Sequence, residues 1–148
     1  MFRANVAALI RYENKYVACG RSDFKTWQCV QGGIEEVDLS PIDAIKRELM
    51  EELGLEENSY RILFQSRFWR RYYFTQEILA KNRFQHNLGQ EQLWFFVELL
   101  DWKGIQLEKS HGEFDRVELF GLEQLIDGYS VWKKPPFVDF CRELDLLK

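Results

Sequence analysis

The sequence predicts a single α+β domain, over residues 1–148, in which a β-sheet is covered by a helix on each face. Three observations predict this class. The chain has 148 residues, which is the length of one compact domain. Short apolar runs separated by turn residues are typical of strands, and two later segments repeat their apolar residues at helical spacing. Because strands and helices bury their apolar faces against one another, we expect the sheet to lie between the helices.

The N-terminal part of the chain is predicted to form strands. Residues 6–11 and 15–19 are apolar runs separated by polar residues at 13–14, which favours a hairpin. Residues 27–30 form a third extended run, which ends at the glycine pair 32–33. Such a pair indicates either a turn or a place where the backbone approaches another group closely.

A helix is predicted over residues 40–53. Ser40 is a good N-cap, Pro41 suits the first helical position, Asp43 lies three residues after the cap, and Gly54 is placed to end the helix. The apolar residues recur at steps of three and four, which predicts an amphipathic helix. They are Ile42, Ile45, Leu49 and Leu53.

The second half of the chain continues the same alternation. Residues 60–71, 93–100 and 117–120 are predicted strands, and a second helix is predicted over about 136–146. Residues 78–88 form a polar, basic connection to which we assign no element. No internal repeat, low-complexity stretch or linker interrupts the sequence, which supports one domain.

Composition narrows the classes of function. Hydrophobic residues make up 46% of the chain and charged residues 30%, as in ordinary globular domains. The net charge is −4, so the protein does not hold nucleic acid by bulk charge, and we expect no DNA partner. Any polyanion must be held by a local basic patch or by metal ions.

The short apolar runs and the pattern of cysteines predict a cytoplasmic protein. The longest apolar stretches, such as residues 93–100, fall far short of the ~20 residues that span a bilayer, so we expect no membrane partner. The N-terminus has too short an apolar run for a signal peptide. Cys19, Cys29 and Cys141 are odd in number and widely spaced, which favours reduced thiols over a disulfide framework or a zinc site.

Three carboxylates share one face of the predicted helix. Glu48, Glu51 and Glu52 stand at positions i, i+3 and i+4. Like charges at the C-terminal end of a helix oppose its dipole, so the cluster costs stability and indicates a purpose other than folding. Oxygen ligands suit magnesium or manganese better than zinc. A solvated acidic face is the alternative, and the surrounding residues argue against it.

The segment GGIEEVDLSPIDAIKRELMEELGL, residues 32–55, resembles the Nudix box of the Nudix hydrolases. Arg47 directly precedes the three glutamates, and Gly54 follows them, as in the family pattern. That pattern has a further acidic residue separated from the arginine by seven residues, and here Leu39 holds the place while Asp38 precedes it. This resembles a one-residue insertion from which Asp38 supplies the missing carboxylate.

The resemblance implies the Nudix fold, an α/β/α sandwich with a mixed sheet between helices. It also implies hydrolysis of a nucleoside diphosphate linked to a further group, with Mg²⁺ or, in its place, Mn²⁺ as cofactor. The implied metal ligands are Glu48, Glu51 and Glu52, together with a backbone carbonyl at Gln31 or Gly32. Arg47 would orient Glu51 or Glu52, and which glutamate acts as the general base stays open.

Segments outside the box resemble bacterial RNA pyrophosphohydrolases and the related dinucleoside polyphosphate hydrolases. They are FRANV at 2–6, WQCVQGG at 27–33, GQEQLWF at 89–95, EFD at 113–115 and VWKK at 131–134. The resemblance therefore covers nearly the whole chain. It implies that Glu113 supplies a fourth carboxylate, metal-binding or catalytic, from a loop far from the box.

The residues predicted to bind substrate combine cationic, amide and aromatic side chains. An acidic protein that binds a 5′-phosphorylated RNA end needs a local cationic funnel and an aromatic platform for an unstacked base. The candidates are Arg3, Arg21, Tyr72, Gln90, Gln92, Trp132, Lys133 and Lys134. A second basic and aromatic set offers the same chemistry, namely Arg67, Phe68, Trp69, Arg70, Arg71, Tyr73, Lys81 and Arg83. His86 and His111 are expected to be solvated loop residues.

The expected function is hydrolysis of the 5′-triphosphate or diphosphate of RNA to a monophosphate. A dinucleoside polyphosphate (Ap4A) hydrolase is the first alternative, because the chemistry is the same. A non-catalytic Nudix domain that senses nucleotides or RNA is the second, and its only support is the altered loop at residues 37–39 together with the missing proline before Gln31. The oligomeric state, protein partners, the preferred base and the preference between triphosphate and diphosphate stay open.

Overall fold

The computed structural model describes residues 1–81 and 87–147, and the strands within them form one mixed sheet. The sheet has the order β3–β2–β1–β7–β5, with β4 beside β1, β6 beside β7 and β8 beside β2. β1 and β7 are parallel, and the other pairs are antiparallel. The strands are β1 (Phe2–Tyr12), β2 (Lys15–Gly20), β3 (Trp27–Gln28), β4 (Val30–Gly33), β5 (Tyr60–Gln65), β6 (Arg70–Tyr73), β7 (Gly89–Leu99) and β8 (Arg116–Phe120).

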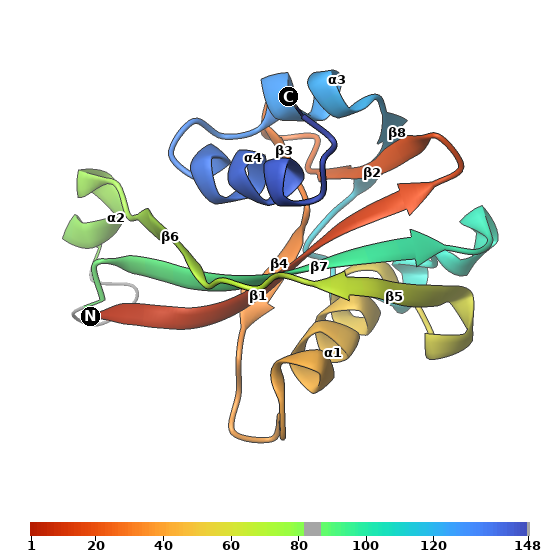
Figure 1. Cartoon of the computed structure of the whole chain (residues 1–148), viewed down its shortest axis with the longest axis horizontal. Helices are drawn as coiled ribbons and strands as arrows, with labels where there is room; N and C mark the ends of the chain where they lie inside the picture. The colour runs from red at the N-terminus through yellow and green to blue at the C-terminus, as the bar shows by residue number, and fades with distance from the viewer. Residues whose placement is uncertain (82–86, 148) are drawn as a thin grey trace.

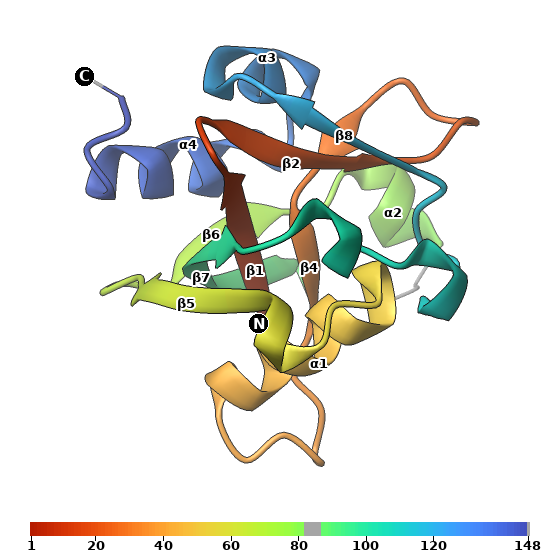
Figure 2. The same ribbon diagram turned by 90° about the vertical axis from the view of Figure 1, so that its right-hand side faces the viewer.

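The helices cover both faces of this sheet. Figure 1 shows α1 below the sheet and α3 and α4 above it, and Figure 2 shows the same layers after a quarter turn. The helices are α1 (Pro41–Leu53), α2 (Gln76–Ala80), α3 (Leu122–Gly128) and α4 (Lys134–Glu143), with short 3₁₀ turns η1 (Glu57–Ser59), η2 (Trp102–Gly104) and η3 (Leu107–Lys109). The predicted fold class, a mixed sheet between helices, is confirmed.

Alternation along β1 supplies a hydrophobic core on each side of the sheet. Val6, Ala8 and Ile10 face α1, while Ala7 and Leu9 face α3 and α4. Both sets are buried, which explains why β1 reads as a continuous apolar run rather than as an alternating one. Among the described residues, none of the helices has the length and apolar composition that crossing a bilayer requires.

The helix that carries the acidic cluster is capped as predicted. The Oγ atom of Ser40 accepts a hydrogen bond from the backbone N–H of Asp43 at 3.3 Å, and Pro41 is the first helical residue. Gly54 ends the helix with φ of 66°, in the left-handed region that favours glycine. A Cβ atom there would lie 2.2 Å from the carbonyl oxygen of Gln106, so glycine is required twice over.

Two predicted strands are each divided in the structure. The run 60–71 is wrong as one strand, because the chain leaves the ladder at Ser66. The backbone N–H of Ser66 donates to the carbonyl of Trp94, its hydroxyl accepts from the Trp94 N–H, and the same hydroxyl donates to the carbonyl of Phe68. The run 27–30 is likewise divided at Cys29 into β3 and β4.

The glycine pair after that run is not a turn. Gly32 and Gly33 belong to β4, and both lie where the backbone approaches a side chain closely. A Cβ atom on Gly32 would be 2.0 Å from the Glu48 carboxyl carbon, and one on Gly33 would be 2.1 Å from the Arg3 guanidinium. The two glycines therefore admit the side chains of a prospective site.

β1 and β7 each begin four residues earlier than predicted, at Phe2 and Gly89. Further differences concern helices. The last helix, α4, begins two residues earlier and ends three residues earlier than predicted. Two short helices, α2 and α3, were not predicted. For α3, the N-cap is Gly121, which offers no side-chain cap, and Leu125 is the one residue of the helix that is buried. α2 begins before the unassigned connection 78–88, of which 82–86 lie outside the described residues.

Candidate active site

A cavity of about 480 Å³ lies where α1, β1, β4, β6 and β7 meet the loop that follows η3. Carboxylates form one side of this cavity, and amide and aromatic side chains form the other. Its lining includes Arg3, Asn5, Gln28, Gln31, Gly32, Glu48, Glu51, Glu52, Tyr72, Phe74, Gln90, His111, Glu113, Trp132 and Lys133. The structure thus brings together most of the residues that the sequence analysis proposed.

The carboxylates come mainly from one face of α1. Glu48 and Glu52 are buried, and Glu51 is half-buried. Carboxylate oxygens of Glu35, Glu48 and Glu51 all lie within 4.8 Å of one another. Glu35 was not proposed from the sequence. The only available signal was its position two residues after the glycine pair.

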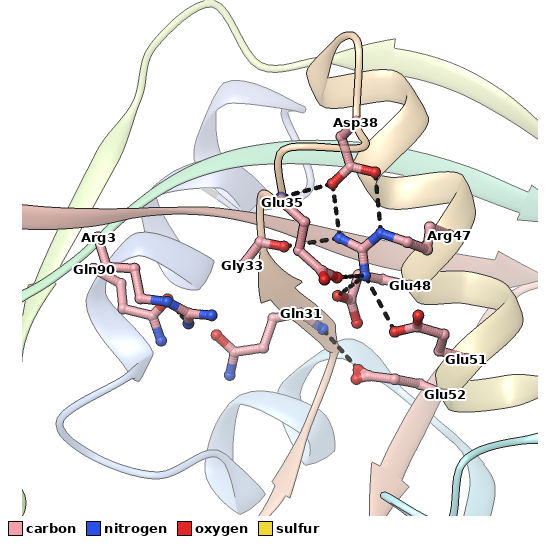
Figure 3. A network of polar contacts seen from close by, with 10 residues as sticks. All are labelled: Arg3, Gln31, Gly33, Glu35, Asp38, Arg47, Glu48, Glu51, Glu52 and Gln90. Carbon is pink, nitrogen blue, oxygen red and sulfur yellow. Dashed lines mark hydrogen bonds and ion pairs between the residues drawn. The ribbon is translucent and has the colours of Figure 1, made fainter. Parts of the chain in front are cut away.

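We call the side of the cavity formed by Glu35, Glu48, Glu51 and Glu52 the acidic wall. Arg47 contacts several of these carboxylates (Figure 3). One terminal nitrogen, Nη1, contacts Glu35 at 2.6 Å, Glu48 at 2.8 Å and Glu51 at 3.1 Å. The other, Nη2, donates to the carbonyl oxygen of Gly33 at 2.9 Å. Arg47 thus neutralises part of the cluster and ties the helix to β4. Of the two glutamates that it was expected to orient, it contacts Glu51, while Glu52 has a different partner.

Asp38 fills the remaining side of the Arg47 guanidinium. Its carboxylate accepts from Arg47 Nε at 3.0 Å and Nη2 at 2.8 Å, and from the backbone N–H of Glu35 at 2.8 Å. The Arg47 guanidinium holds the pKa of the Asp38 carboxyl below its usual value. Leu39, which holds the family's acidic position, is 92% exposed. The acidic partner of Arg47 is therefore Asp38, at one residue's offset.

Glu52 lies deepest in the acidic wall. One of its carboxylate oxygens accepts a hydrogen bond from the backbone N–H of Gln31 at 3.2 Å. Burial raises the pKa of Glu52 well above its usual value, and the charges of Glu48 and Glu113 add to this effect. Burial also raises the pKa of Glu48, although Arg47 opposes the shift.

This donor set fits a hard divalent cation. The ligand atoms are carboxylate oxygens, they converge, and at least two of the carboxylates are poorly solvated. One guanidinium does not neutralise Glu35, Glu48, Glu51 and Asp38 together, so further positive charge would relieve their repulsion. Glu52 and Glu113 line the same cavity and complete the group of carboxylates that face it.

Aromatic side chains form the opposite wall. The rings of Tyr72 and Trp132 meet edge to face with centroids 5.4 Å apart, and Phe74 lies 6.4 Å from Trp132. The Lys133 ammonium lies 5.0 Å from the centre of the Trp132 ring. Tyr72 is buried, and burial raises the pKa of its hydroxyl. This side of the cavity thus offers an aromatic surface for a flat ligand and, beside it, a positive charge.

Other predicted substrate residues lie outside this cavity. Gln92 is 1% exposed and lies behind the wall. Arg21 lines a neighbouring cavity of about 730 Å³ together with Lys81, and its guanidinium pairs with Asp23 at 3.0 Å. Lys134 begins α4 and is not among the described residues that line either of these cavities.

Arg70 is the buried member of the second basic and aromatic set among the described residues. It pairs with Asp139 at 2.6 Å and Glu143 at 2.8 Å, which fixes α4 to the sheet. Arg71 pairs with Glu91 at 3.1 Å and lies over the ring of Phe2. Other members of this set lie nearby, with Arg67 beside Glu143, Phe68 and Trp69 exposed after β5, and Tyr73 at the end of β6.

The two histidines are placed differently. His111 has an exposed side chain, as expected, but it also lines the cavity, and its backbone N–H donates to the carbonyl of Glu51 at 2.7 Å. His86 and Arg83 lie outside the described residues.

Comparison with known proteins identifies the family. Residues 1–140 match the NUDIX domain, and the chain therefore belongs to the Nudix family. It is 34% identical over 117 residues to a protein of Xylella fastidiosa (strain M12) named RNA pyrophosphohydrolase, covering 77% of this chain and 61% of that protein. A Pseudomonas aeruginosa (strain LESB58) protein of the same name is 36% identical over 117 residues, covering 77% and 73%.

A solved structure shows the same fold at low sequence identity. The Escherichia coli dihydroneopterin triphosphate pyrophosphohydrolase superposes with a TM-score of 0.75 at 14% identity, covering 95% of this chain and 96% of that one. The predicted Nudix fold is confirmed.

Proposed function

We propose that this protein is a metal-dependent pyrophosphohydrolase that converts the 5′-triphosphate or diphosphate of RNA to a monophosphate. One observation carries the proposal: a single cavity has carboxylates that suit a divalent cation on one side and an aromatic wall on the other. The names of the Xylella and Pseudomonas relatives support RNA as the substrate.

The acidic wall would hold Mg²⁺, or Mn²⁺, through Glu48, Glu51 and Glu52, with Glu35 and Glu113 as additional carboxylates. Such an ion offsets negative charge on phosphate oxygens and makes water a better nucleophile. The chain's own contribution is to fix the carboxylates before substrate arrives. Arg47 holds Glu48 and Glu51, and the backbone N–H of Gln31 holds Glu52.

The opposite wall would hold the RNA end. Arg3 and Lys133 line the cavity and supply positive charge for phosphates. Trp132 lies in the loop before α4, where a terminal base can stack on it. Stacking of one base on an aromatic side chain is worth ~1–3 kcal/mol, which is enough to hold an unpaired terminal nucleotide.

An assay that offers three substrates at equal concentration tests this function. We would supply 5′-triphosphorylated short RNA, its diphosphorylated form and Ap4A with Mg²⁺, and follow conversion to monophosphate. Glu52→Gln should lower the rate of RNA conversion about 10³-fold or more, because it removes one carboxylate of the acidic wall. Glu123→Gln, on α3, is the matched control and should leave the rate unchanged.

The other outcomes separate the alternatives. Cleavage of Ap4A far above that of RNA would make the protein a dinucleoside polyphosphate hydrolase. Tight Mg²⁺-dependent binding of RNA ends without turnover would identify a sensor. If Glu52→Gln converts RNA within a few-fold of the unaltered protein, the assignment of the acidic wall is wrong.

A further inference from the structure

A chain of side-chain hydrogen bonds runs behind the amide side of the cavity, and each of its two ends is a group that can only donate. At one end, the indole N–H of Trp94 donates to Gln92 Oε1 at 3.1 Å. At the other, the guanidinium of Arg3 donates to Gln90 Oε1 at 3.4 Å. Because indole and guanidinium contain no acceptor, each fixes the neighbouring amide with its oxygen toward the donor.

These two amides set the direction of every following bond. Gln92 turns its NH₂ group to Asn5 Oδ1 at 2.9 Å and to Gln31 Oε1 at 2.7 Å. Gln90 turns its NH₂ group to the Tyr72 hydroxyl at 2.7 Å, and that hydroxyl donates onward to Gln31 Oε1 at 3.3 Å. Both branches therefore converge on one oxygen, and Gln31 has only its NH₂ group left to offer.

Where this chain of hydrogen bonds reaches the cavity, it presents hydrogen-bond donors. Gln31 Nε2 donates to Gln28 Oε1 at 2.9 Å, which turns the NH₂ group of Gln28 outward. Gln28 and Gln31 both line the cavity, whereas Trp94 and Gln92 are each 1% exposed. Reversing Gln90 or Gln92 would set like groups face to face in a buried place and would leave a polar atom unsatisfied.

We propose that Trp94 and Gln92 are positioning residues that make this wall a hydrogen-bond donor. The wall then selects a base with a keto oxygen over a base with an exocyclic amino group at the same position. Trp132 lines the same cavity as Gln28 and Gln31, so a base stacked on its ring would lie in the cavity that these amides also line. The inference rests on the proposed function only in taking a nucleotide as the ligand.

Inosine and adenosine 5′-monophosphate are matched probes for this preference. They share the purine frame and differ along one edge: inosine has a keto oxygen at position 6 and an N–H at position 1, and adenosine has an amino group at position 6 and an acceptor nitrogen at position 1. Neither contains a phosphoanhydride, so turnover does not disturb a titration. We expect the inosine nucleotide to bind about 3- to 10-fold more tightly, which is the effect of one net hydrogen bond. Equal affinities would overturn the inference.

Variants then test the positioning role. Trp94→Phe removes the N–H and keeps an aromatic ring, so Gln92 loses the donor that fixes its direction and the affinity ratio should fall. The branch from Arg3 still holds Gln31, so the ratio should stay above one. Phe140→Leu is the matched control, because that ring lies 5.6 Å from Trp94 in the same core. It loosens the packing and keeps the N–H, so the ratio should persist. Gln28→Glu places an acceptor at the end of the chain and should reverse the preference.

The outcomes separate this inference from the proposed function. A preserved affinity ratio in a protein that does not convert RNA ends contradicts the function and leaves the inference standing. If the protein converts RNA ends but binds the two nucleotides with equal affinity, the proposed function stands and the inference is wrong. If Trp94→Phe folds, as judged by its melting temperature, and keeps the full ratio, then Trp94 has no positioning role.

Discussion

The two walls of the cavity are built in opposite ways. The acidic wall comes almost entirely from one continuous segment, residues 31–52, and is held together by the charge of Arg47. The amide wall is the hydrogen-bonded set Arg3, Asn5, Gln28, Gln31, Tyr72, Gln90 and Gln92. It is assembled from β1, β3, β4, β6 and β7, and is neutral apart from Arg3. The first wall depends on charge balance and the second on hydrogen-bond direction, so different perturbations should affect each.

The largest effect on stability is expected at Arg47. Arg47→Ala would leave the buried carboxylates of Asp38 and Glu48 without their cation, which costs on the order of 3 kcal/mol in the free energy of unfolding. Urea denaturation in metal-free buffer measures it. Arg61→Ala is the control, because Arg61 is exposed and pairs with Glu98 at 3.0 Å, a contact worth at most about 1 kcal/mol. Equal losses of unfolding free energy for the two variants would show that Arg47 does not hold the carboxylates of the acidic wall together.

Cation binding and pH should change the stability of the protein through the acidic wall and not through the amide wall. The folded-state pKa values of Glu48 and Glu52 are raised, so the stability linked to them is present at low pH and is lost as pH rises through those values. Metal-free protein should therefore melt at a lower temperature near about pH 7 than near about pH 5. The lowered pKa of Asp38 acts below this window.

Mg²⁺ should reverse that loss. A cation at 100 times its dissociation constant adds about 2.7 kcal/mol to the free energy of unfolding, and the gain should be larger at neutral pH, where the carboxylates are ionised. Thermal melts with Mg²⁺ and with a chelator measure this gain. Glu52→Gln should reduce the pH dependence, whereas Gln92→Leu should keep it. A Mg²⁺ effect that is the same at both pH values would contradict this account.

The same contrast explains what could be predicted from the sequence. The acidic wall depends on helical spacing, so positions i, i+3 and i+4 place Glu48, Glu51 and Glu52 on one face before any fold is known. The caps of α1 at Ser40 and Gly54 are equally local and are confirmed. Glu35 was missed because it reaches the cluster only after the loop before α1 folds back toward Arg47.

Several residues of the amide wall were named from the resemblance, but their hydrogen-bond chain could not be predicted, for a different reason. Gln31, Gln90 and Gln92 meet only because β1 pairs with both β4 and β7. That pairing is a property of sheet topology and not of any local pattern. The structural role of Arg70 was not predicted for the same reason, since Arg70 contacts Asp139 and Glu143 only when α4 packs on the sheet. Aromatic and basic composition alone does not separate a binding surface from a packed one.

The smallest effects should locate the acidic partner of Arg47. Asp38→Asn weakens two charged hydrogen bonds and should cost about 1.5 kcal/mol in the free energy of unfolding. Leu39→Ala should change it by no more than about 0.5 kcal/mol, because that side chain is in solvent. Urea denaturation of both variants and of Asp38→Asn combined with Leu39→Asp measures these effects.

The combined variant is the decisive one. The Leu39 side chain is exposed to solvent, so an aspartate there should not restore what Asp38→Asn loses. Full recovery would mean that the loop changes register at little cost and that the acidic wall tolerates either position. No recovery would mean that Asp38 is held in place by its own bond to the backbone N–H of Glu35, so that the wall is fixed by its loop as firmly as by its charges.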